Sequence, residues 1–74
     1  MNIYGKEVYY MKGIKEVRKS ANITQEELSY LMDVSLSTVR RWDKKIDNCP
    51  CSKFVLLCDI LHYSSIDDLM EELQ

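Results

Sequence analysis

Two helix-start signals close together in the middle of the chain constrain its fold more than any other feature of the sequence. Thr24 is followed three positions later by Glu27, the spacing of a capping box in which each side chain bonds the other residue's backbone amide. Ser35 gives a second start signal, with apolar Val34 directly before it. A helix of about eight residues is therefore followed, after a short turn, by another helix, which predicts a helix-turn-helix unit.

The rest of the chain predicts an all-α protein. Its 74 residues suffice for one small domain, and two Gly and one Pro are too few for the turns of a β-sandwich or barrel. Apolar residues recur at helical spacing, and Ser52 and either Ser64 or Ser65 stand where they can cap the last two helices. We expect a compact five-helix domain over residues 11–74, with helices at about 11–20, 25–32, 36–44, 52–62 and 66–73.

Three details of this expectation concern particular parts of the chain. The 52–62 helix is apolar almost all round, which predicts a central rod buried on most sides. Residues 1–10 show no clear period and are an arm or an extra element, in which Tyr9 and Tyr10 pack on the domain more readily than they stack on bases. Asn22 and Asp33 are expected to take the left-handed conformation that ends a helix.

The charge of the chain is unevenly distributed. Its formal net charge of −2 argues mildly against a nucleic-acid partner. Residues 1–48, however, hold nine Lys and Arg against seven Asp and Glu, a sum of +2, whereas residues 49–74 hold one against five, a sum of −4. The first part can therefore still face phosphate. Neither a membrane-spanning run nor a secretory signal is found, and an odd set of three cysteines favours reduced thiols, so we expect a cytoplasmic protein.

The 36–44 helix separates into two faces when its residues are placed 100° apart. Val39 and Trp42 fall on an apolar side that a core can hold. The opposite side carries mainly polar and basic side chains, namely Leu36, Ser37, Arg40, Arg41 and Lys44. A helix with such a basic face fits the major groove of DNA.

From Ile14 to Met70 the chain resembles the lambda-repressor-like, Xre-family helix-turn-helix domains. The residues that carry the resemblance are Arg18, the run 24–28, the turn 33–35, the run 37–43, Pro50 and the run 66–69. The chain departs from the family pattern at Asp33, where a glycine is usual. It departs again after Asp43, because Lys44-Lys45 follows this acidic residue where the family usually has a glycine.

The resemblance implies a dimeric domain that binds double-stranded DNA sequence-specifically, with the 36–44 helix in the major groove. It also implies a structural ion pair between Arg18 and Asp43. Base readout is expected from Leu36, Ser37 and Arg41, since an Arg can bond guanine in a fork and a Leu can cover a thymine methyl. Phosphate contacts are expected from the start of the 25–32 helix and from neighbouring hydroxyl and basic side chains: Thr24, Gln25, Ser35, Arg40, Lys44 and Lys45.

We expect a transcriptional regulator that acts as a repressor by steric blocking and dimerises through an apolar stripe of Leu69, Met70 and Leu73. The alternative is a protein-interaction module, antitoxin-like or docking a larger regulator, on the same scaffold. The two differ in the salt dependence of duplex binding.

Other chemistry is weakly supported. A zinc site from Cys49, Cys51, Cys58 and His62 is conceivable, but the Cys49-x-Cys51 spacing is unusual for structural zinc, and no metal or cofactor is expected. Thiol oxidation at Cys49 or Cys51 is a further hypothesis. No nucleophile, base and orienting group can be assembled, so we expect neither an enzyme nor a small-molecule ligand.

Overall fold

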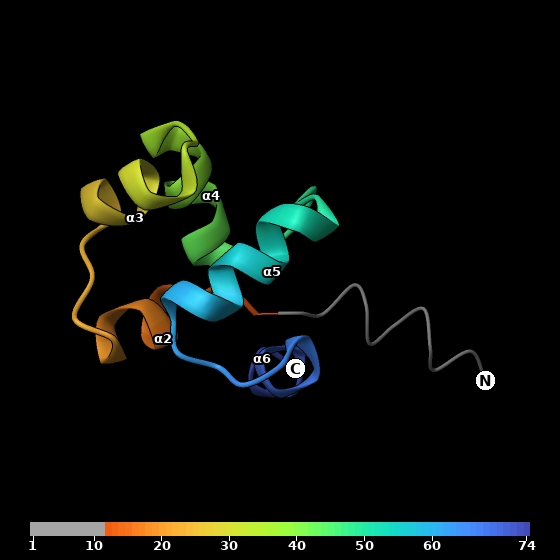
Figure 1. The fold of residues 1–74 in the computed structure, drawn as a ribbon. Helices are drawn as coiled ribbons and strands as arrows, with labels where there is room; N and C mark the ends of the chain where they lie inside the picture. Colours follow the sequence, from red (N-terminus) through yellow and green to blue (C-terminus); the bar gives the residue numbers. More distant parts are fainter. Residues whose placement is uncertain (1–11) are drawn as a thin grey trace.

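A computed structural model describes residues 12–74, and this part of the chain forms five helices and no strand (Figure 1). The predicted all-α, five-helix architecture is confirmed. The expectations for residues 1–10, including Tyr9 and Tyr10, lie outside the described residues. The helices are α2 (Lys15–Ser20), α3 (Gln25–Met32), α4 (Leu36–Lys44), α5 (Cys51–Ile60) and α6 (Ile66–Glu72).

The helices surround one apolar core. Helix α4 packs on α2 and α3, α5 packs on α3 and α6, and α6 lies below α5 in the view of Figure 1. Apolar side chains from every helix, or from the residue next to it, meet in the middle and have almost no exposed surface. The largest fully buried ones are Trp42, Ile14, Leu28, Met32, Leu57, Leu69, Leu73 and Val39.

The two central helices begin as the sequence predicts. Thr24 Oγ1 accepts a hydrogen bond from the Glu27 amide at 3.0 Å, and a Glu27 carboxylate oxygen accepts one from the Thr24 amide at 2.9 Å, which completes the capping box. Ser35 Oγ accepts from the Thr38 amide at 3.2 Å and caps α4. Between the two helices, Asp33 adopts φ 55°, the left-handed conformation expected there, as Asn22 does with φ 61°.

Helix α2 is shorter than expected, since it begins at Lys15 and not near residue 11. Residues 12 and 14 bond other parts of the fold instead. The Lys12 amide donates to the Leu73 carbonyl at 2.6 Å, and the Ile14 amide donates to the Trp42 carbonyl at 2.9 Å. Their backbone groups are thus used to tie the start of the described chain to α4 and to the end of α6.

The limits of the last two helices also differ in part. Ser52 is not the cap of α5, because the helix already begins at Cys51 and the first backbone bond runs from the Phe54 amide to the Pro50 carbonyl. The helix ends at Ile60, and His62 then turns the chain with φ 67°. Ser65 does cap α6, since its hydroxyl accepts from the Asp68 amide at 3.2 Å.

The prediction that the helix expected at 52–62, which is α5 in the structure, is buried on most sides is wrong. Leu57 and Cys58 of α5 are buried, but Val55 is 49% exposed and Leu56 is 37% exposed. Helix α5 touches α3 and α6, and within residues 12–74 no further helix packs closely against it. Its remaining face is therefore left at the surface.

The apolar stripe of α6 is not free for a partner, which corrects a second expectation. Leu69 and Leu73 are 0% and 1% exposed and belong to the core, and only Met70 is half-buried. The reason is geometric: α6 is the last helix, and its apolar side closes the core of this small domain. Leu69 and Leu73 therefore cannot supply the dimer contact.

Gly13 allows the start of the described chain to lie directly on α4. A Cβ placed on Gly13 would overlap the Asp43 carbonyl group and the Lys44 backbone. These are backbone atoms at the end of a packed helix, so they cannot rotate away as a flexible side chain would.

We expect Gly13→Ala to lower the free energy of unfolding by about 1–3 kcal/mol, because the added methyl group forces the backbones apart. Urea denaturation followed by circular dichroism measures the change. Ser20→Ala, at an exposed position of α2, is the control and should leave the midpoint almost unchanged. Equal midpoints for both variants would contradict this account of Gly13.

Candidate nucleic-acid interface

Helix α4 presents one face to the core and the other to solvent. Val39 and Trp42 are 0% and 1% exposed and hold the helix from inside. The side chains of Arg40, Arg41 and Lys44 are exposed. The helix is thus fixed in orientation by its apolar side, and its basic side is open.

The hydroxyl groups at the start of α4 bond one another. Ser35 Oγ lies 3.0 Å from Ser37 Oγ and 2.9 Å from Thr38 Oγ1. A hydroxyl group has one donor and two acceptor positions, so Ser37, which is exposed, keeps capacity for an outside partner. Leu36 is half-buried rather than fully exposed and is not among the side chains that pack on the core.

A buried ion pair connects α2 to the end of α4. Arg18 Nη2 lies 2.8 Å from Asp43 Oδ2, and Arg18 Nε donates to Oδ1 at 3.0 Å, so the pair is bidentate. Arg18 Nη1 also donates to the Ile23 carbonyl at 2.8 Å. The structure therefore contains the Arg18–Asp43 pair that the family resemblance implied.

The environment of Asp43 lowers its pKa. Burial acts to raise the pKa of this carboxyl group, but the hydrogen bonds from Arg18 and Gln25 and the positive charges of Arg18 and Lys15 lower it more. The carboxylate is thus charged at neutral pH and holds the pair together.

Gln25 joins this network, which the sequence did not reveal. Its Nε2 donates to Asp43 Oδ2 at 2.8 Å and thereby ties the start of α3 to the end of α4. A side-chain amide carries two N–H donors, so one remains for the phosphate contact expected of Gln25. A side chain already held by Asp43 is also a more rigid donor than a free one.

Arg41 has a partner that the sequence pattern did not suggest. Its Nε donates to Asp47 Oδ1 at 3.1 Å, in an ion pair whose side chains are 49% and 39% exposed. The contact spans the end of the helix, where helical periodicity gives no information about which side chains meet. Lys45 follows the last residue of α4; its backbone is extended and its side chain is exposed.

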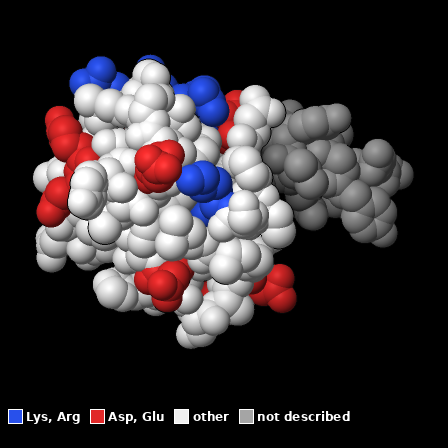
Figure 2. All heavy atoms as spheres, turned by 45° about the horizontal axis from the view of Figure 1, so that its top comes forward, with Lys and Arg blue, Asp and Glu red and all other residues white. Residues whose placement is uncertain are grey.

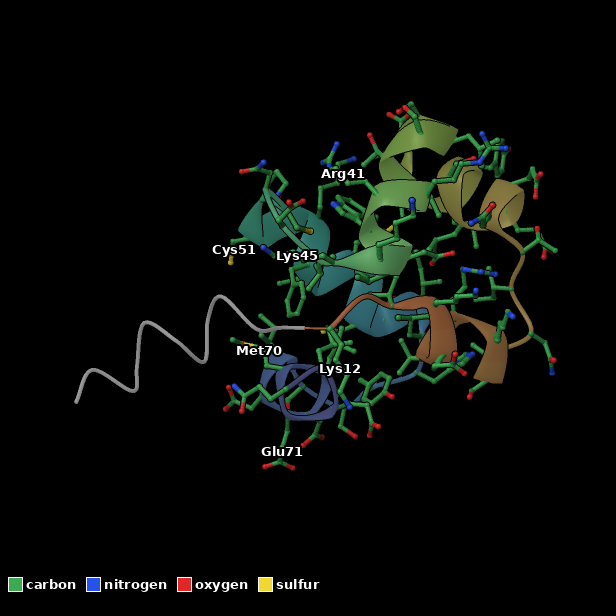
Figure 3. The ribbon with its side chains drawn as sticks, turned by 180° about the vertical axis from the view of Figure 1, so that it is seen from behind. Lys12, Arg41, Lys45, Cys51, Met70 and Glu71 are labelled. Carbon is green, nitrogen blue, oxygen red and sulfur yellow. The ribbon has the colours of Figure 1, made fainter. Side chains whose placement is uncertain are left out.

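Basic side chains gather mainly along one edge of the surface, whereas acidic ones are spread more widely. Figure 2 shows most Lys and Arg atoms along the upper edge of the face in view, and Asp and Glu atoms on its left flank, near its centre and in its lower half, some of them beside basic side chains. In Figure 3, Arg41 and Lys45 lie beside α4, whereas Lys12, Met70 and Glu71 lie around α6. The basic part of the surface therefore belongs to the side of α4.

The cysteines show no sign of a metal site. Residues 12–74 contain no group of three His, Cys, Asp or Glu side chains placed to hold an ion. Burial, with the neighbouring Cys51 and Cys58, raises the pKa of Cys49 to about 11. At neutral pH this thiol is protonated and reacts slowly with oxidants, which argues against Cys49 as an oxidation sensor.

None of the described helices has the length and hydropathy needed to cross a bilayer.

Comparison with known families identifies the central segment. Residues 14–42, which span α2, α3 and most of α4, match the family described as Helix-turn-helix. The match covers less than half of the chain; within it, the segment is similar to the helix-turn-helix of lambda-repressor-like, Xre-type domains, which supports a DNA-binding regulator. Searches of curated proteins and of solved structures gave no match.

We expect Arg18→Met to lower the free energy of unfolding at pH 7 by about 3–5 kcal/mol, because it leaves the buried Asp43 carboxylate without its cation. The lowered pKa of Asp43 means that the pair stabilises the wild type above pH about 4 and loses this effect as the carboxylate is protonated in acid. The cost of Arg18→Met should therefore shrink as the pH falls.

Chemical denaturation at several pH values measures this cost, with Lys19→Met at an exposed position of α2 as the control. The double variant Arg18→Met/Asp43→Leu removes both charges and should recover much of the lost stability. A cost for Arg18→Met that equals the control, or that does not change with pH, would rule out this role of the pair.

Proposed function

We propose that this protein is a sequence-specific regulator of transcription that binds double-stranded DNA as a homodimer. Helix α4 enters the major groove, and bound protein represses by blocking access to the DNA. The observation that carries the proposal is the fixed orientation of α4, with Val39 and Trp42 buried and Arg40 and Arg41 exposed on the other side.

The side chains around α4 divide into two groups by chemistry. Arg41, Ser37 and Leu36 lie on the outward part of the helix and are proposed to read base edges. Phosphate contacts are proposed for side chains at the start of α3, at the cap of α4 and at its basic end: Thr24, Gln25, Ser35, Arg40, Lys44 and Lys45. Contacts of the second kind set affinity and register, and those of the first kind set sequence preference.

The homodimer needs a surface other than Leu69 and Leu73. Val55 and Leu56 of α5 are the exposed large apolar residues beside α6, and they line a groove of about 500 Å³ with Tyr63 and Ile66. We propose that a second copy of this chain covers them, because a twofold dimer places two recognition helices on an inverted repeat with half-sites about one duplex turn apart.

The first prediction of this proposal concerns salt. The affinity of the wild type for duplex DNA should fall steeply as salt rises, because phosphate binding by Lys and Arg releases counterions. Fluorescence anisotropy with a labelled duplex, selected from a random pool, measures it. A flat response would instead favour a protein-interaction module, for which exposed Tyr30 and Leu31 on α3 offer apolar surface.

A pair of variants tests the division of roles. Arg41→Ala should cost about 1–3 kcal/mol and relax the preference at one base pair, whereas Gln25→Ala should weaken all duplexes alike. Binding to the selected duplex and to its single-pair variants measures both. Uniform losses for Arg41→Ala would show that Arg41 contacts phosphate only.

A third experiment addresses the dimer. Val55→Asp/Leu56→Asp should convert the dimer to a monomer, because it places charges in the proposed apolar contact. Light scattering after size exclusion measures the mass. Tyr30→Asp, which changes an exposed apolar residue on α3, is the control and should remain dimeric. A double variant that stays dimeric would exclude this face of α5.

A further inference from the structure

We infer that Asp47 is a positioning residue that fixes the direction of Arg41 and thereby contributes to the sequence preference of DNA binding. The inference rests on the proposed function, because it assigns a role within the same interface. Asp47 belongs to the loop between α4 and α5, outside the segment that matches the helix-turn-helix family.

Two consecutive residues of α4 hold Asp47. Trp42 is 1% exposed, and its Nε1 donates to the Asp47 carbonyl at 3.0 Å, which fixes the loop backbone to the core. Arg41 Nε donates to Asp47 Oδ1 at 3.1 Å. The carboxylate is thus not on a freely moving loop, and it can fix the guanidinium group that it bonds.

Asp47 bonds Arg41 through Nε, which leaves the two Nη atoms of Arg41 available to contact a base. A guanidinium group has five N–H donors, one on Nε and four on the two Nη atoms. Within residues 12–74 the only hydrogen bond that the structure gives the Arg41 side chain is the one through Nε. The Nη pair remains for guanine O6 and N7, and a guanidinium held at Nε presents that pair end-on.

Stability does not account for this contact. Both side chains are well exposed, at 49% and 39%, and ion pairs of this kind contribute little to folding. The negative charge has a second effect, however, since it partly neutralises Arg41 and weakens its attraction to phosphates of any sequence. Hydrogen bonds from the Nη pair to a guanine are retained. Asp47 therefore favours the specific duplex over other duplexes.

The experiment compares Asp47→Ala, Asp47→Asn and the control Glu71→Gln, which removes an exposed acid on α6, outside the proposed DNA and dimer contacts. The readout is the ratio of affinities for the selected duplex and for the same duplex changed at the base pair where Arg41→Ala loses its preference. Both duplexes have the same phosphates, so the overall charge cancels in this ratio. Partial unfolding also cancels, because it lowers both affinities equally.

We expect Asp47→Ala to reduce this ratio about tenfold, the lower part of the range for one bidentate base contact. Asp47→Asn should keep most of the ratio, because an amide oxygen can still accept from Arg41 Nε. Both variants should bind nonspecific DNA more tightly, with a salt slope steeper by about one, because Arg41 is no longer neutralised. Glu71→Gln should change neither quantity by this amount.

An unchanged ratio in Asp47→Ala would overturn the inference, even with tighter nonspecific binding, since Asp47 would then act by charge alone. Equal loss of the ratio in Asp47→Ala and Asp47→Asn would also overturn it. Failure of the proposed function has a different signature: the wild type itself would show no duplex binding or no preference, and the inference would fall with it.

Discussion

The bidentate pair between Arg18 and Asp43 is the interaction on which the arrangement of the helices depends. It joins α2 to the end of α4, and Gln25 adds the start of α3 to the same carboxylate. Three helices that are separate in the sequence therefore meet at one buried anion. A buried pair of this kind adds little net stability, but it strongly disfavours arrangements in which either charge loses its partner. We regard it as a device that fixes the angle of α4.

The outward face of α4 follows from that constraint and from packing. Trp42 and Val39 place one side of the helix in the core, and Asp43 anchors its last turn, so the helix can neither roll nor tilt without exposing apolar surface or separating charges. The basic side chains are carried by a rigid element. Rigid presentation reduces the entropy lost when such side chains bind a ligand.

Much of this could be predicted from the sequence because the signals are local. A capping box, a hydroxyl cap and a residue that tolerates positive φ act over three or four positions, and Thr24, Ser35 and Asp33 behave as expected. The helix ends that were misplaced depend on tertiary contacts: the helix expected from residue 11 begins at Lys15 because nearby backbone groups bond α4 and α6.

The features that could not be predicted are relations between distant faces. The apolar pattern of α5 and α6 is the same whether a side chain meets the core or solvent, so the burial of Leu69 and the exposure of Val55 required the packed structure. The contacts of Gln25 with Asp43 and of Arg41 with Asp47 join residues across helix ends, where no periodic rule applies.

The backbone hydrogen bond between Lys12 and Leu73 determines where another protein or a tag can be attached to this domain. It places the first and the last of the described residues next to each other, on the side of α6 (Figure 3). A tag or fused partner joined to Gln74 would leave the molecule there, away from the edge formed by α3 and α4. A partner joined at Gln74 would therefore leave the exposed face of α4 uncovered.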